Sequence, residues 1–292
     1  MAPSDLPGSE QGTGPTARRM ILGTQLRRLR ERAAITRAKA AWEIRASESK
    51  ISRMELGRVG FKERDVTDLL TMYGVHDETE REWALRMVKE CNQPGWWHPY
   101  NDLMPGWFDN YLGLEEAASR IRTYELMFVP GLLQTERYAR SVISHGDPES
   151  RDEDVERKVG LRMRRQKLLH GPKPPRLWAV IDEAVLERPF GGAAVLKEQL
   201  GHLLELIELP TVTIQVIPFD MSGFAAESAF ALLQFAEPDL PNIAYVEHLN
   251  GAQYLEKLED IEVYGRAFDR LAVDAETPDR TRQMLLKKRA EL

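Results

Sequence analysis

The sequence of 292 residues contains one cysteine, Cys91, and six histidines that stand singly. A lone cysteine excludes a disulfide framework and a cysteine-based metal site, and the histidines lack the spacing of metal ligands. No run of 18 apolar residues occurs, and the first residues lack the apolar core of a signal peptide. We therefore expect a cytoplasmic protein without a membrane span, a metal or a cofactor.

Motifs that mark enzymes are also missing. The chain has no nucleophile elbow, phosphate-binding loop, GxGxxG or HExxH. The nearest approach to a catalytic cluster is formed by Asp182, Glu183 and Glu187, and acid–base catalysis by such groups needs two carboxylates that face one cleft. We expect no catalytic residues and no enzymatic activity.

Charge is distributed unevenly along the chain. Residues 17–64 contain fourteen Lys and Arg but five acids, a balance of +9, whereas the whole chain carries −6 and the remainder therefore −15. A basic block joined to an acidic body predicts a module that binds a polyanion. The alternative is an ordinary solvated helical surface.

The basic block is predicted to be a helical domain over residues 17–92, preceded by a disordered tail at 1–16 that is rich in Pro, Gly, Ser and Thr. Apolar spacing predicts helices at 17–33, 37–44, 47–55, 63–72 and 77–92. Thr36 and Ser47 are suitable N-caps, and Gly57 and Gly74 suit helix ends. Two short helices joined by a tight turn indicate a helix-turn-helix.

The stretch "LRRLRERAAITRAKAAWEIRASESKISRMELGRV" resembles the Xre/phage-repressor DNA-binding family across the whole domain. One position departs from the family pattern: the turn usually holds glycine, but this chain has Arg45 and Ala46, so the turn must form without the freedom of glycine. The resemblance also implies that Glu55 has a structural role, paired with Arg30 on the first helix.

The resemblance implies that the helix beginning at Ser47 is the recognition helix. We expect base edges to be contacted by its first and outward residues, which are Ser47, Glu48, Ser49, Ser52 and Arg53. An alternative role for Glu48 is stabilisation of the helix dipole. Phosphate contacts are expected from Arg37, Lys50, Arg58 and Lys62.

An aromatic connector at 93–113 follows, and it contains Trp96, Trp97, Trp107, Phe108 and Tyr111. Such clusters usually pack a linker onto a neighbouring domain, and a ligand pocket is the alternative. Arg162, Arg164 and Arg165 are expected on the solvated face of a helix.

Residues 114–292 are predicted to form an α+β domain. We expect helices at 114–123, 136–144, 152–169, 193–208 and 260–290, and strands at 125–129, 177–182, 211–217, 229–235 and 243–248. Short connections between the last three strands favour antiparallel pairing. The predicted fold is an all-α N-terminal helix-turn-helix bundle followed by an α+β domain with a mainly antiparallel sheet.

The segments "VPGLLQTERYARSVI", "RMRRQKLL", "AVIDEAVLERPFGG" and "TVTIQVIPFD" resemble the C-terminal domain of actinobacterial Xre-type, antitoxin-like regulators of the WhiJ type. This resemblance implies a domain for sensing, dimerisation or partner binding, and a small acidic partner protein encoded nearby. We expect a homodimeric, sequence-specific regulator of transcription that binds double-stranded DNA under control of an effector or partner. The alternative is an antitoxin-like adaptor that neutralises a partner, with DNA binding secondary.

Overall fold

The computed structural model describes residues 14–221, 223, 226–238 and 240–292. It divides into two compact units: an N-terminal unit, up to residue 98 with 109–117 and 235–241, and a C-terminal unit, 99–108, 118–234 and 242–292. Most of the predicted tail, residues 1–13, lies outside the described residues. Pro15 and Thr16 were wrongly assigned to that tail, because Pro15 occupies the first helical position, which suits its fixed φ, and Thr16 is buried.

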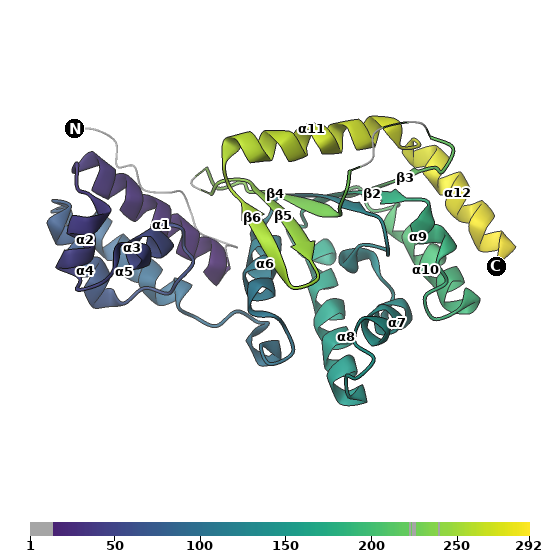
Figure 1. The fold of residues 1–292 in the computed structure, drawn as a ribbon, viewed down its shortest axis with the longest axis horizontal. Coiled ribbons are helices and arrows are strands. Elements are labelled where there is room, and N and C mark those ends of the chain that lie inside the picture. Colours follow the sequence, from purple (N-terminus) through teal and green to yellow (C-terminus); the bar gives the residue numbers. More distant parts are fainter. Residues whose placement is uncertain (1–13, 222, 224–225, 239) are drawn as a thin grey trace. The chain divides into compact units, whose positions relative to one another are not determined.

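The five predicted helices of the N-terminal unit are confirmed. They are α1 (Pro15–Arg32), α2 (Arg37–Glu43), α3 (Glu48–Glu55), α4 (Glu63–Met72) and α5 (Glu78–Cys91) (Figure 1). Thr36 and Ser47 cap α2 and α3 as expected, because their side chains accept hydrogen bonds from the amides of Lys39 and Lys50. The apolar stripes meet in one core, where Leu26, Ile51 and Met87 are fully buried.

Four successive helices of this unit end in the same way. After α1, α2, α3 and α4 the chain adopts a left-handed residue, at Ala34, Arg45, Gly57 and Gly74 respectively, with φ between +52° and +74°. In each case the amides of the left-handed residue and of the residue after it donate back to carbonyls of the helix. After α2, for example, the amide of Arg45 donates to Trp42 O and that of Ala46 to Ala41 O. These are Schellman motifs, and only two of the four use glycine.

The connector contains more helix than expected. A 3₁₀ turn covers His98–Tyr100, and α6 covers Gly106–Ala117. The predicted helix at 114–123 is therefore wrong in both bounds, and the boundary placed between 113 and 114 falls inside α6. Trp97 is buried and donates to Asp109, and its ring packs beside Gly113, so within the N-terminal unit the aromatic residue fixes α6.

The C-terminal unit is built on a six-stranded mixed sheet in the order β3-β2-β1-β4-β5-β6. Its strands are β1 (Arg120–Glu125), β2 (Arg176–Asp182), β3 (Val212–Ile217), β4 (Phe230–Gln234), β5 (Ile243–His248) and β6 (Gly251–Leu255). Strands β1, β2 and β3 are parallel, whereas the β1–β4, β4–β5 and β5–β6 pairs are antiparallel. The predicted α+β class with a mainly antiparallel sheet is confirmed.

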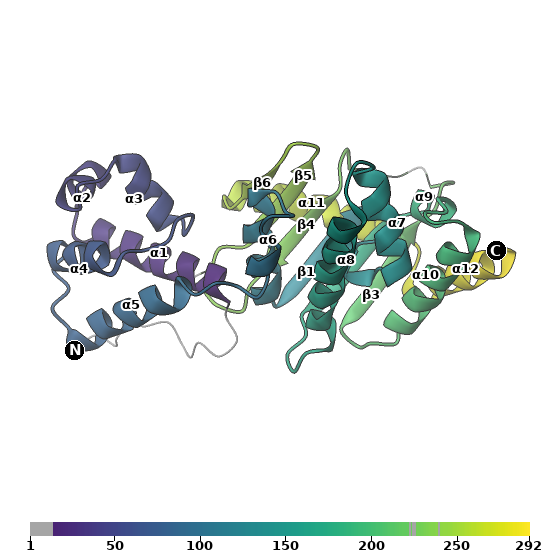
Figure 2. The same ribbon diagram turned by 90° about the horizontal axis from the view of Figure 1, so that it is seen from below.

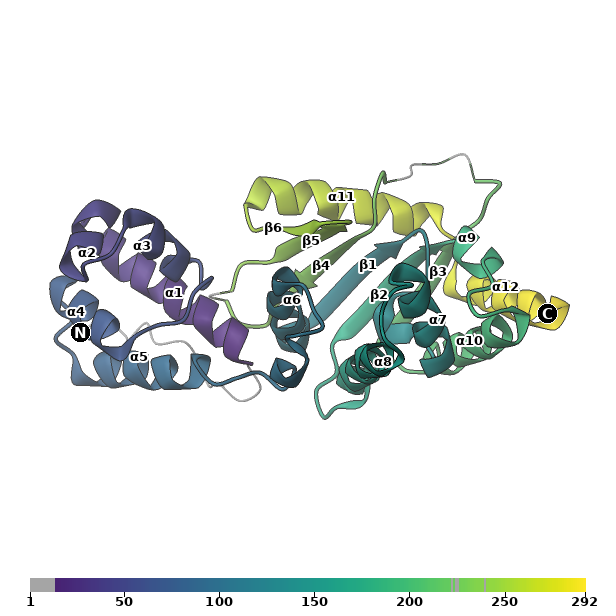
Figure 3. The same cartoon turned by 60° about the horizontal axis from the view of Figure 1, so that its bottom comes forward.

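Helices cover both faces of this sheet (Figures 1 and 3). The crossovers between the parallel strands supply α7 (Glu136–Gly146), α8 (Asp152–Gln166), a 3₁₀ turn at Lys167–His170, α9 (Ala184–Glu187) and α10 (Ala193–Leu206). The opposite face is covered by α11 (Leu258–Asp274), whose Phe268 and Leu271 pack on Tyr124, Val180 and Phe230. The final helix, α12 (Pro278–Glu291), packs against α10 and β3.

Several predictions within this unit are wrong. The first strand lies at 120–125 instead of 125–129, β6 was missed, and the expected helix at 260–290 is two helices separated at Ala275–Thr277 by the N-cap Thr277 and Pro278. β3 pairs in parallel with β2 instead of antiparallel with β4, because the crossover through α9 and α10 places it beside β2. Arg165 is buried and stacks 5.1 Å from the ring centre of Phe108, and Arg162 donates to Gln134, so only Arg164 lies on the expected solvated face.

Glu125, at the end of β1, gives a testable dependence of stability on pH. Burial and the neighbouring carboxylate of Glu247 raise the pKa of Glu125 to about 8, against the opposing charge of Arg162. The unfolded chain releases this proton at the ordinary carboxyl pKa, so the folded state holds more protons between about pH 4.5 and 8. We therefore expect this residue's contribution to the unfolding free energy to fall as pH rises through that window.

Urea unfolding of the wild type and of Glu125→Gln at pH 5 and pH 8 measures this contribution. The variant should lose part of the pH dependence, by at most about 1.4 kcal/mol per pH unit, the limit for one proton. Glu149→Gln, at an exposed position, serves as the control. Equal pH dependence in all three proteins would contradict the assignment.

Candidate nucleic-acid interface

Helix α3 lies beside α2 (Figure 2), and one of its faces is polar. Its inward residues, Ile51, Met54 and Glu55, are buried. On its outer side Ser47, Glu48, Ser49 and Arg53 are exposed and Ser52 is partly exposed. The predicted base-reading residues therefore share one accessible face, which is the arrangement that a recognition helix requires.

The C-terminal end of α3 is fixed by close approach to α1. A Cβ atom added at Gly23 would lie 2.4 Å from Met54 O and 2.8 Å from Glu55 O. A Cβ at Gly57 would lie 2.6 Å from the Cα of Met20. Glycine at both positions lets the two backbones pack directly, so α3 has little freedom to move along α1.

A buried ion pair connects the same two helices. Arg30 on α1 donates from Nε and Nη2 to the two carboxylate oxygens of Glu55, at 2.5 and 3.1 Å, and from Nη1 to Ile35 O at 2.9 Å. The hydrogen bond to Glu55 raises the pKa of Arg30. Arg37 on α2 donates to the same carboxylate at 3.1 Å, so one acid joins three helices. The expected pairing of Arg30 with Glu55 is confirmed.

A second internal pair connects α3 to α4. Lys50 Nζ lies 2.6 Å from a carboxylate oxygen of Asp65, and Arg64 donates to the other oxygen at 3.1 Å. Asp65 is buried, which opposes its ionisation, but these two hydrogen bonds outweigh burial and lower its pKa. Lys50 and Arg37, both expected at phosphates, thus already have partners inside the domain.

The other predicted phosphate contacts, Arg58 and Lys62, lie at exposed positions after α3. Sequence reasoning missed two further exposed residues on the α2 side, Trp42, whose exposed fraction is 79%, and Arg45. The absence of glycine from the turn was the feature of the sequence that could have drawn attention to Arg45. The structure shows that arginine takes the left-handed conformation itself, with φ of +52°.

The aromatic residues of the predicted connector do not form one cluster, because they belong to different units. Trp96, Trp97 and Tyr111 belong to the N-terminal unit, whereas Trp107 and Phe108 belong to the C-terminal unit. The three carboxylates of the acidic cluster each have a structural contact: Asp182 with the amide of Ala184, Glu183 with the amide of Phe219, and Glu187 with Lys288. Among the residues that the structure describes, no helix is long and apolar enough to cross a membrane.

Comparison with protein families finds two matches. Residues 21–84 match a helix-turn-helix domain, the region that contains α2 and α3. Residues 108–287 match a domain of unknown function (DUF5753). Comparison with curated proteins and with solved structures gives no match.

The chain is therefore a helix-turn-helix protein, a class typical of DNA-binding regulators. The second match covers more than half of its length, and the chain belongs to the DUF5753 family.

The buried pair of Arg30 and Glu55 predicts strong coupling in a double-mutant cycle. Removing one partner leaves a charge in the core, which costs about 3–5 kcal/mol. With Arg30→Met and Glu55→Gln, we expect a coupling energy above about 1 kcal/mol in chemical unfolding. The exposed pair of Arg27 and Glu31, whose N–O distance is 2.9 Å, is the control and should couple by less than about 0.5 kcal/mol. Similar coupling in both pairs would contradict a structural role for burial.

We expect substitution of Arg45 by glycine to have opposite effects on stability and on DNA affinity. A left-handed conformation costs a non-glycine residue about 1–2 kcal/mol of folding free energy. Glycine avoids this cost, but its greater freedom in the unfolded chain lowers stability by about 0.5–1 kcal/mol. Arg45→Gly should therefore stabilise the N-terminal unit slightly while lowering DNA affinity, since a cation beside α3 is lost. Ala34→Gly, at the equivalent position after α1, should stabilise without changing affinity. Unfolding curves and DNA titrations distinguish these outcomes, and a destabilised Arg45→Gly protein would contradict the strain argument.

Proposed function

We propose that this protein is a sequence-specific DNA-binding regulator of transcription, similar to Xre-type regulators. The observation that carries the proposal is the exposed face of α3, anchored by buried contacts inside a segment with a balance of +9. A fixed helix with accessible polar side chains suits the major groove, and a basic surface suits the phosphates.

The exposed residues on α3 and on the segments that flank it divide into two roles in this proposal. Arg53 suits a guanine edge and Glu48 a cytosine amino group, while Ser47, Ser49 and Ser52 adapt to either base. Arg45, Arg58 and Lys62 meet phosphates. Arg37 and Lys50 contribute charge to the surface but remain in their internal pairs.

The division between base and phosphate contacts is tested on the full-length protein with a DNA site selected from a random pool. Arg53→Ala should reduce discrimination at one base pair by roughly 1–3 kcal/mol. Lys62→Ala should weaken binding to all sequences equally and reduce the salt slope by about 1. Equal loss on every sequence from both substitutions would contradict the division, and absence of binding by the wild type at low salt would contradict the proposed function.

We also propose a homodimer whose interface lies beyond residue 95. One recognition helix reads too few base pairs to find a genomic site, whereas two helices roughly 34 Å apart read a near-palindrome. In this proposal the basic segment, at +9, faces the DNA, and two copies of it repel each other, so the interface is placed outside that segment. Light scattering tests this proposal: a monomer that binds one palindromic site tightly would contradict it.

The C-terminal unit, in this proposal, receives a signal in the cytoplasm, from an effector or from a small acidic partner as in antitoxin-like regulators of the WhiJ type. The alternative is an adaptor that neutralises such a partner. Co-purification from the native host distinguishes the adaptor from an effector-controlled sensor, because a stoichiometric small protein supports the adaptor and its absence supports the effector-controlled sensor.

A further inference from the structure

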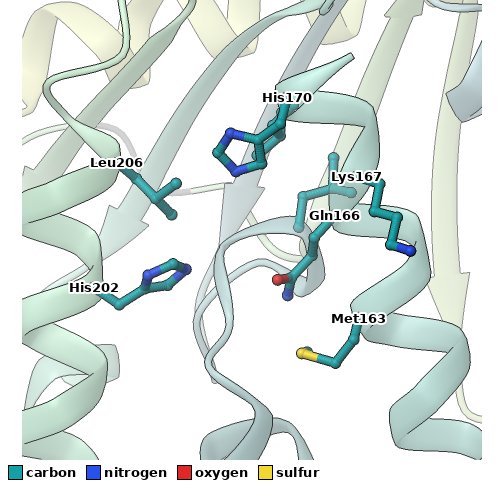
Figure 4. A pocket seen from close by; sticks show the side chains of 8 residues that line it. Met163, Gln166, Lys167, His170, His202 and Leu206 are labelled. Atoms are coloured by element: carbon teal, nitrogen blue, oxygen red, sulfur yellow. The ribbon is translucent and has the colours of Figure 1, made fainter.

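The C-terminal unit contains a cavity of about 430 Å³ beside the PGLLQT segment at 130–135, a volume within the range of small-molecule sites. The residues that line it come from three elements of the same unit: the 3₁₀ turn Gly131–Leu133, the end of α8 with the turn after it, and α10. They are Leu132, Met163, Gln166, Lys167, Leu169, His170, His202 and Leu206. The two helical walls face each other across this space: His202 and Leu206 extend from α10, and Met163, Gln166 and His170 extend from the opposite side (Figure 4).

The PGLLQT wall is held by two amide side chains, one of them buried. Gln199 of α10 donates to Leu133 O at 2.7 Å and accepts from the amide of Thr135 at 2.7 Å. Gln166 of α8 donates to Gly131 O at 3.0 Å and to Gln134 O at 2.6 Å. Because the loop is bonded to both helices, the cavity is fixed before a ligand arrives, which reduces the ordering cost of binding.

The chemistry of the lining is amphipathic and contains no carboxylate. Four side chains are apolar: Leu132, Met163, Leu169 and Leu206. The remaining four are Lys167, which is cationic, His170 and His202, which can donate hydrogen bonds, and the amide Gln166. Glu205, outside the lining, lies 3.7 Å from Nδ1 of His202. In Figure 4 the ammonium of Lys167 lies on the side away from α10, at the margin of the site.

We infer that this cavity binds a small amphipathic carboxylate, with its carboxylate between the imidazoles of His170 and His202 and its hydrocarbon part on the four apolar side chains. A carboxylate accepts hydrogen bonds from both rings, and hydrogen bonds to a charged group are stronger than neutral ones. A cation finds no carboxylate among the eight lining residues, and a neutral molecule forms only the weaker neutral hydrogen bonds with the two rings. The inference names the class of effector for the proposed regulator, and in that respect it rests on the proposed function.

The test uses the full-length protein without DNA, so that failure here is distinguishable from failure of DNA binding. The probe is hexanoate, and hexanamide and hexylamine, which keep the chain but change the head group, are the comparison ligands. Titration calorimetry should detect hexanoate binding, at least about tenfold tighter than that of either comparison ligand, because each of them loses an interaction with a charged acceptor.

Variants locate the binding. His170→Gln with His202→Gln should weaken hexanoate binding about tenfold or more, and Lys167→Gln by a smaller factor. His248→Gln and Lys197→Gln, which remove the same residue types at exposed positions outside the lining, should leave the affinity unchanged. Since the substituted side chains are exposed or partly exposed, folding is expected to survive, and circular dichroism checks it. No binding of hexanoate, equal binding of the three ligands, or equal affinity in all variants would each overturn the inference.

Discussion

The buried carboxylate of Glu55 is the constraint on which the N-terminal unit depends. A lone charge at this depth would be costly, and Arg30 compensates it with two hydrogen bonds while a third reaches Ile35 O. Arg37 adds α2 to the same carboxylate. Because α1, α2 and α3 meet at one ionic centre, the angle between the two helices of the helix-turn-helix is set from inside. Precise placement is what base reading demands, since useful contacts tolerate only small errors in position.

The N-terminal unit was predictable because its information is local. Apolar spacing, the caps at Thr36 and Ser47, and the stops at Gly57 and Gly74 each act within one or two turns of helix, and the structure shows them where the sequence indicates. The absence of glycine from the turn after α2 already indicated that another residue there, Arg45, has to form the turn. What the sequence did not indicate is the number of cations already paired inside the domain. Lys50 has the pattern of a surface lysine, yet it compensates the buried Asp65.

The C-terminal unit was less predictable because its order is set by distant contacts. The sequence identified β2, β3, β4 and β5 closely, and the fold class with them. The pairing of β3 with β2 follows from a crossover through α9 and α10. The order of the strands along the sequence does not indicate this pairing. Arg165 is an example at a single residue. Its charge predicts a solvent-exposed side chain, but stacking on Phe108 buries it. The position of Phe108 depends on packing, which no local pattern encodes.

The rigidity of the helix-turn-helix limits how the proposed regulator can respond to a signal. An effector changes DNA affinity only if it binds two states of the protein with different affinity. The core contacts of Gly23, Glu55 and Asp65 hold α3 against its neighbouring helices, and a shift of α3 would separate these buried charges from their partners. In the proposed dimer, a signal received in the C-terminal unit would therefore act on how the two DNA-binding units are spaced, and not on the recognition helix itself. In a dimer that reads two half-sites, a small change in spacing is sufficient, because both helices must fit their grooves at once.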